Sequence, residues 1–404
     1  MLDKIKKYSW LIDSLMEAKW STKKEVVHNF LNAKKKYVPK EKTNAKVGDI
    51  LKCALCPNMC RFDCPVARVG NSEALTPAAK SRIAYLMEMG EIDFSGEFVD
   101  LMYKCAGCDA SREWCPFDFS VEDLLVGVRE DIVDKGLAPK ALLELKDKLE
   151  KNHQIYDQSL IPPDTEAEKA RILYFMGCTA RAKVPDVVNT NIKLLEKSGL
   201  DFATIPDEWC CGAPLSTLGF KDSFYKFAEH NSRLINKSKC RTLVCDCPEC
   251  AYVFRELYPK IGFRLKAEIL PMNQFLLRLV EENKIKPAGL QGEFVYHDPC
   301  ALSRKLNVCS APRELLKSIP GLELKETYFS HRETRCCGMG GMLGITNPEI
   351  SSKIGESRIS ELKEVCSNIV TACPTCELAF KNANKDKKVK VYDISEVLLK
   401  SLEK

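Results

Sequence analysis

The chain has 404 residues, of which 45% are hydrophobic and 29% charged, as expected for a globular protein of about two to four domains. This composition excludes disordered and collagen-like chains, and the apolar runs are too short for a transmembrane helix. No apolar signal segment is visible near the first methionine, so we expect a cytoplasmic protein whose 21 cysteines hold metal or do chemistry instead of forming disulfides.

Residues 1–46 form a basic arm. It holds 12 lysines and five acidic residues, a charge of +7, so the rest of the chain contributes −2 to the total of +5. Apolar residues at helical spacing predict an amphipathic helix, namely Ile5, Tyr8, Ile12, Leu15 and Met16. The helix either packs on the body or docks to an acidic protein or to anionic lipid at the inner face of a membrane. Its lysines lack the interleaved aromatic residues typical of nucleic-acid binding.

Residues 47–152, the ferredoxin-like module, contain seven cysteines among segments expected to be helical. The runs Cys53-x2-Cys56-x3-Cys60-x3-Cys64-Pro65 and Cys105-x2-Cys108-x6-Cys115-Pro116 are close to the bacterial ferredoxin pattern. In the usual crossed arrangement, one [4Fe-4S] cluster takes Cys53, Cys56, Cys60 and Cys115. The second takes Cys64, Cys105 and Cys108, which leaves one corner open.

Ser111 stands where the ferredoxin pattern expects the missing cysteine. Three explanations are open: Ser111 or Asp109 supplies an oxygen ligand, the second cluster contains three irons, or the second cluster is absent. Zinc is the alternative metal for the whole module, because it also favours thiolates with paired spacing, although a terminal Cys-Pro in both runs favours iron–sulfur.

Residues 153–168 contain Ile161-Pro162-Pro163 and are expected to be a linker. The first repeat (169–290) and the second repeat (291–404) then alternate short β-rich runs with helical segments. We therefore predict an α/β fold: a mainly helical N-terminal module, followed by two duplicated α/β domains with parallel sheets.

The two repeats match in their cysteines, at an offset of 122 residues for the first and 126 for the other four. The first cysteine set is Cys178, Cys210, Cys211, Cys247 and Cys250, and the second is Cys300, Cys336, Cys337, Cys373 and Cys376. Such matching indicates an internal duplication. Five thiolates exceed the four ligands of a zinc site or a cubane, which suggests a larger metal assembly. Glycines beside each Cys-Cys pair, such as Gly212 and Gly338, allow a loop that turns both sulfurs inward.

The two repeats resemble the cysteine-rich CCG domain of heterodisulfide reductase and related iron–sulfur oxidoreductases. The motifs that carry the resemblance are Phe175-Met-Gly-Cys178 and His297-Asp-Pro-Cys300 together with the two complete cysteine sets. A two-cluster ferredoxin module fused to two CCG repeats is similar to the D-type subunit of heterodisulfide reductase. The resemblance covers about residues 47–404, leaves the basic arm outside, and departs from the family's pattern at Ser111.

This resemblance implies that each cysteine set holds a noncubane [4Fe-4S] cluster and that a disulfide is reduced, or thiols oxidised, between the two clusters. Electrons would come from the ferredoxin-like module and, before it, from a flavoprotein, ferredoxin or membrane cytochrome partner. His297 is a candidate proton donor to a leaving thiolate. The alternative function is an electron-transfer protein that links a flavoprotein dehydrogenase, such as a 2-hydroxy acid oxidase, to a quinone or membrane cytochrome.

Overall fold

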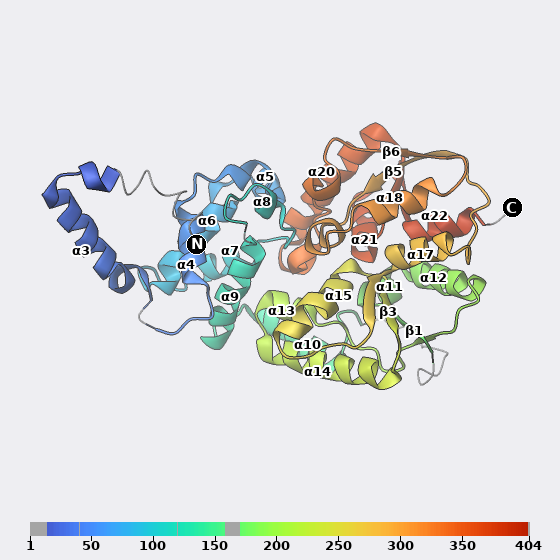
Figure 1. Ribbon diagram of the computed structural model, residues 1–404, viewed down its shortest axis with the longest axis horizontal. Coiled ribbons are helices and arrows are strands. Elements are labelled where there is room, and N and C mark those ends of the chain that lie inside the picture. Colours follow the sequence, from blue (N-terminus) through green and yellow to red (C-terminus); the bar gives the residue numbers. More distant parts are fainter. Residues whose placement is uncertain (1–13, 40, 119, 158–169, 403–404) are drawn as a thin grey trace.

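Figure 1 shows a computed structural model of the chain, which describes residues 14–39, 41–118, 120–157 and 170–402. Two four-stranded parallel sheets form the two repeats, and the helical ferredoxin-like module lies against both of them. The predicted α/β class with a helical N-terminal module is therefore confirmed. Among the described residues, no helix is both long and apolar enough to span a bilayer.

The first repeat is a parallel sheet in the order β2-β1-β3-β4. Its strands are β1 (Ile172–Phe175), β2 (Phe202–Thr204), β3 (Thr242–Cys245) and β4 (Glu268–Pro271). The central strands are buried almost throughout, because helices cover both faces of the sheet. These helices include α11 (Cys178–Lys183), α12 (Pro185–Lys197), α13 (Ala213–Leu218), α14 (Lys221–Ser238), α15 (Pro248–Tyr252) and α17 (Met272–Glu281).

The second repeat has the same topology, in the order β6-β5-β7-β8. Its strands are β5 (Gly292–His297), β6 (Leu322–Lys325), β7 (Asn368–Thr371) and β8 (Lys390–Asp393). Its helical segments include the π-helix η4 (Ala301–Lys305) and the α-helices α18 (Ser310–Lys317), α20 (Pro348–Val365), α21 (Pro374–Ala383) and α22 (Ile394–Lys400). Identical strand order in both repeats is what a duplicated unit should give.

The two repeats pack on each other with approximate two-fold symmetry. Helix α12 of the first repeat packs on α22 of the second, and the equivalent pair, α17 and α18, packs in the same way. The pairs α15 with η4 and α11 with α21 are likewise equivalent contacts. Because an isologous interface brings equivalent positions together at its axis, this packing places matching cysteines of the two repeats opposite one another.

The ferredoxin-like module is built from short helices, as expected for residues 47–152. They are α4 (Val47–Leu55), α5 (Pro65–Gly70), α6 (Pro77–Glu88), α7 (Gly96–Tyr103), α8 (Ala110–Glu113), α9 (Val121–Asp134) and α10 (Lys140–Asn152). The Thr76 hydroxyl accepts a hydrogen bond from the Ala79 N–H at the start of α6, and Ser120 caps α9 through the Asp123 N–H. Arg129 of α9 donates to the Thr217 carbonyl at 2.7 Å, which ties the module to the first repeat.

The basic arm contributes α3 (Trp20–Tyr37), which stands away from the rest of the molecule in Figure 1. Its apolar side chains Trp20 and Leu31 are 79% and 72% exposed, so the described helix does not pack its apolar residues on the body. This exposure favours the docking interpretation over the packed one. The predicted helical positions Ile5, Tyr8 and Ile12 lie outside the described residues.

Candidate metal centre

Both cysteine sets lie at the carboxyl ends of central strands. Cys178 and Cys247 follow β1 and β3 in the first sheet, and Cys300 and Cys373 follow β5 and β7 in the second. In each sheet these two strands are neighbours whose following connections run to opposite sides, which is the place where parallel sheets form binding crevices. The Cys-Pro-x-Cys segments open α15 and α21 directly, so Cys247 and Cys373 cap helix N-termini.

The two Cys-Cys loops make the tight turns that their neighbouring glycines allow. Gly212 has φ +84° and Gly338 has φ +97°, both in the left-handed region that disfavours a side chain. A Cβ at Gly338 would lie 2.5 Å from the Ser351 carbonyl oxygen, so the loop also needs glycine for space. Both pairs, Cys210-Cys211 and Cys336-Cys337, are buried and face the other members of their sets.

The sulfur atoms of each set converge. The Sγ atoms of Cys178 and Cys210 are 3.9 Å apart, and those of Cys337 and Cys376 are 3.2 Å apart. At the boundary between the repeats, the thiol of Cys247 contacts that of its symmetry equivalent, Cys373. The two sets therefore form one continuous region of sulfur ligands.

The thiols of this region favour deprotonation at selected positions. The pKa of Cys337 lies well below its usual value because Cys336 and Cys376 hydrogen-bond to it. The pKa of Cys247 is lowered by hydrogen bonds with Cys250 and with Cys373. Hydrogen bonds from neighbouring thiols, together with burial, raise the pKa of most of the others, such as Cys178, Cys250 and Cys376. The fit of the donor set to iron–sulfur clusters therefore rests on the convergence of the thiols in each set.

A single cavity joins the two cysteine sets. It contains about 1020 Å³ of space between atoms, part of it open to solvent, and its lining is mainly apolar. Nine of the ten cysteines line it, all except Cys336. Tyr156 and Ile155 also line it, so the beginning of the stretch expected as a linker contributes to the wall of the cavity. The sequence showed no signal for this role, because neither residue belongs to a motif.

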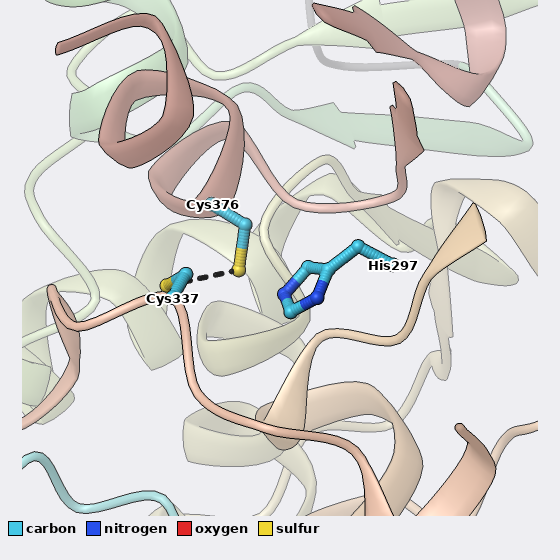
Figure 2. A group of neighbouring side chains, drawn as sticks. All are labelled: His297, Cys337 and Cys376. Atoms are coloured by element: carbon cyan, nitrogen blue, oxygen red, sulfur yellow. Dashed lines mark hydrogen bonds between the residues drawn. The ribbon is translucent and has the colours of Figure 1, made fainter. Parts of the chain in front are cut away.

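His297 lies beside Cys337 and Cys376 of the second cysteine set, as Figure 2 shows. One ring nitrogen and the sulfur atoms of Cys337 and Cys376 all lie within 4.8 Å of one another. Arg358 Nε donates to His297 Nδ1 at 3.4 Å, and the buried Nε2 has no hydrogen-bond partner among the described residues. Burial lowers the pKa of His297, so the neutral ring is favoured. The described residues that line the cavity do not include His297, so its predicted role as a proton donor stays a prediction.

The cysteines of the ferredoxin-like module fall into two groups. The first group brings Cys115 beside Cys53 and Cys56, with Cys60 next to them. The second brings Cys64 beside Cys105 and Cys108, and burial is the main reason that the pKa of Cys64 rises to about 11. This grouping has the crossed pattern predicted from the spacing, in which Cys64 and Cys115 exchange partners between the runs.

Buried oxygen atoms lie beside the open corner of the second group. Asp109 and Ser111 line a small cavity together with Cys64, Cys105 and Cys108. Both are buried, and Asp109 Oδ1 has no hydrogen-bond partner in the described part of the chain. An orphaned buried carboxylate oxygen beside three thiols fits an oxygen ligand for a fourth iron, although the identity of that ligand stays a prediction.

Placing a cysteine at position 111, where the ferredoxin pattern expects one, tests which group fills the fourth ligand position of the second group. We expect Ser111→Cys to raise the iron content of the anaerobically purified protein, or to sharpen its cubane signal, because a thiolate binds iron more tightly than an oxygen ligand. Iron analysis and electron paramagnetic resonance (EPR) spectroscopy measure both. An unchanged iron content and spectrum would mean that another group already completes the site.

The loop after Cys336-Cys337 packs tightly on the ferredoxin-like module. A Cβ at Gly341 would lie 2.2 Å from the Cys105 carbonyl oxygen, and one at Gly340 would lie 2.4 Å from that of Ala106. Arg304 Nη1 donates to the Cys108 carbonyl at 2.8 Å, and the Cys108 thiol contacts Cys336. Sequence reasoning missed this contact and Arg304, because the partners are about 200 residues apart and share no motif.

Comparison with known proteins agrees with this geometry. A family model described as a cysteine-rich domain (CCG) matches residues 172–255 and 294–381. The D-type subunit of the dihydromethanophenazine:CoB–CoM heterodisulfide reductase of Methanosarcina barkeri is 31% identical over 323 residues, which cover 76% of this chain and 79% of that relative. The chain belongs to the family of D-type heterodisulfide reductase subunits.

Less similar relatives match this chain over part of larger proteins. The B-type subunit of the fumarate reductase (CoM/CoB) of Methanothermobacter marburgensis is 28% identical over 74% of this chain and 61% of that protein. EtfAB:quinone oxidoreductase of Syntrophomonas wolfei is 26% identical over 75% of this chain and 47% of that protein. As a member of the D-type heterodisulfide reductase family, this chain is an iron–sulfur oxidoreductase, and relatives of it are subunits of larger enzymes.

Proposed function

We propose that this protein reduces a small disulfide to two thiols in the cavity between its repeats. The observation that carries the proposal is that nine cysteines from two complete sets line one cavity. Cleaving the disulfide breaks one S–S bond and consumes two electrons and two protons. Two equivalent sets that face each other at an approximate two-fold axis suit a reaction in which two sulfur atoms separate symmetrically.

The chain's own residues prepare this cavity. Bound clusters would supply single electrons and iron atoms with affinity for sulfur, held by the two cysteine sets and by the module. The apolar lining, which includes Pro214, Pro299 and Met342, disfavours ordered water against the space where the disulfide would bind. Arg358 donates to His297 Nδ1, which holds the ring beside Cys337 and leaves Nε2 without a partner among the described residues.

The electrons are proposed to arrive from the Cys105–Cys108 loop of the ferredoxin-like module. That loop contacts the second repeat through Cys108 and Cys336 and through the glycine loop at Gly340 and Gly341. Arg332 adds a two-pronged ion pair with Glu113, at 2.7 and 2.9 Å. These contacts support delivery to the second cysteine set before the first.

The electron donor is proposed to be a separate protein, and α3 is the surface that suits its attachment. The helix presents exposed Trp20 and Leu31 beside basic residues such as Lys24. We expect the protein to sediment with vesicles that contain anionic phospholipid and not with neutral vesicles if the arm docks on membrane. A double variant, Trp20→Ala with Leu31→Ala, should lose that binding. Equal recovery with both kinds of vesicle would leave an acidic protein as the partner.

EPR spectroscopy of anaerobically purified, oxidised protein tests the proposed function. Added coenzyme M, a small thiol, should produce a new signal that is absent without it, since the thiol is one product of the proposed reaction. Reducible cubane signals with no response to thiol would contradict disulfide chemistry. They would favour the alternative of an electron-transfer protein, to which the similarity with EtfAB:quinone oxidoreductase also points.

A further inference from the structure

The cavity that holds the two cysteine sets needs a source of protons. The proposed reaction adds two protons to two sulfur atoms, yet most of the cavity wall is apolar or sulfur. Among the described residues that line it, the only carboxylates are Glu122 of α9 and Glu249 of α15. Both pair with the same ammonium group, that of Lys305 in η4.

These three residues form an ion cluster at the junction of the three parts of the protein. Lys305 Nζ lies 2.8 Å from a Glu122 oxygen and 2.9 Å from a Glu249 oxygen. The side chains of Lys305 and Glu122 are only 6% and 10% exposed. Two carboxylates and one ammonium leave a net charge of −1 at a buried place. Taking up one proton makes the cluster neutral, which burial favours.

The ion cluster separates two spaces. On the inner side is the cavity of the cysteine sets, and on the outer side is a groove whose rim includes Asp123, Lys221 and Tyr225. Glu122 and Glu249 line both spaces, as do Ala213 and Thr217. Glu122 and Glu249 are the titratable groups shared by the two spaces, so they offer a route by which a proton passes from the groove to the cavity.

We propose that Glu122, held by Lys305, carries protons from the outer groove to the cavity during reduction. Glu122 is the more buried of the two carboxylates, 10% exposed against 30% for Glu249, so it gains more from becoming neutral. The proposal rests on the proposed function for its stoichiometry: one disulfide, two electrons from a reduced donor and two protons from solvent become two thiols.

The groups that face Glu122 support this assignment. Besides Lys305 and Glu249, they are Asp109 of the ferredoxin-like module and, on the far side of Lys305, Tyr252, whose ring centre is 5.1 Å from the ammonium nitrogen. Burial raises the pKa of Glu122 to about 7, with Lys305 opposing and Glu249 adding to the rise. A carrier works best when its pKa is near the ambient pH.

Infrared difference spectroscopy of the cluster-loaded protein, oxidised against electrochemically reduced, tests the proposal without any disulfide. Reduction should produce a protonated-carboxyl band in the wild type that is missing in Glu122→Gln. Glu88→Gln is a matched control, because burial also raises the pKa of Glu88 to about 7, but Glu88 lies on α6 and is not among the lining residues of the cavity. A band that persists in Glu122→Gln, or that is absent from the wild type, would overturn the proposal.

A turnover assay uses the CoB–CoM heterodisulfide, the substrate in the relative's name, with reduced viologen as the electron donor. Glu122→Gln should slow turnover by about 100-fold while its oxidised EPR spectrum stays like that of the wild type. Unchanged turnover would contradict proton delivery by Glu122. A wild type that does not reduce the disulfide would overturn the proposed function, and the infrared band would still decide whether Glu122 takes up a proton. If Glu122→Gln loses its clusters, Glu122→Asp must shift the band, and an unshifted band would overturn the assignment.

Discussion

Replacing Cys337 with alanine is expected to abolish the metal centre of the second repeat and the EPR signal that depends on added thiol. Cys337 contacts both Cys336 and Cys376 and carries the most favoured thiolate of its set. Its loss removes the ligand at the centre of the group, so the remaining thiols no longer surround one site. We expect the cubane signals of the ferredoxin-like module to stay, because their cysteines lie in separate groups.

Cys240→Ala is the matched control for this experiment. Cys240 is also buried, 7% exposed, but it belongs to neither cysteine set and hydrogen-bonds with Ser238. Iron analysis, sulfide analysis and EPR should be indistinguishable from the wild type in the control. A Cys337→Ala protein with the full iron content and an unchanged thiol response would contradict the ligand assignment of the second set.

Gly341→Ala is expected to slow the passage of electrons from the ferredoxin-like module to the second repeat. Gly341 has φ +61°, and an added Cβ would lie 2.2 Å from the Cys105 carbonyl oxygen. The left-handed conformation alone costs about 1–2 kcal/mol with a side chain, and the clash is with backbone that cannot rotate away. The two loops must therefore move apart, which lengthens the contact between Cys108 and Cys336.

Rapid-freeze EPR after mixing with dithionite measures this effect. The cubane signals of Gly341→Ala should appear at the wild-type rate, while those of the second cysteine set appear several-fold later. Gly344→Ala is the control from the same loop, because its added Cβ would come closest to the flexible Met339 side chain, at 3.3 Å. Equal rates in Gly341→Ala and the wild type would show that electrons do not cross at this contact.

Much of the fold prediction rested on local features of the chain, namely apolar runs and the spacing of cysteines. The central strands β1, β3, β5 and β7 are runs of buried apolar residues, whose pattern can be read without knowledge of the fold. The short β-rich runs at 202–205 and 322–324 also indicated the edge strands β2 and β6, whereas the edge strands β4 and β8 were missed. The duplicated cysteines were found because ligand sets repeat at a constant offset.

The contacts between the two repeats, and between the ferredoxin-like module and the second repeat, could not be predicted from such local features. The meeting of Cys247 with Cys373 joins residues 126 positions apart, and that of Cys108 with Cys336 joins residues 228 apart. Neither contact follows from spacing. The first depends on how helices α12, α17, α18 and α22 pack the two repeats together, and the second on how the module packs on the second repeat, for instance through α5 and α20. The cluster of Glu122, Glu249 and Lys305 arises in the same way, from three elements that are adjacent only in the folded protein.

The sequence by itself thus determined the α/β class, the duplication and the two cysteine sets, because apolar periodicity and ligand spacing are local properties of a chain. Only the tertiary structure decided that both sets open into one cavity and that Ser111 and Asp109 are buried beside three thiols. It also decided that an ion cluster separates that cavity from the outer groove. The physical reason is that shared cavities and buried charges depend on packing between distant segments, which is a property of the whole fold.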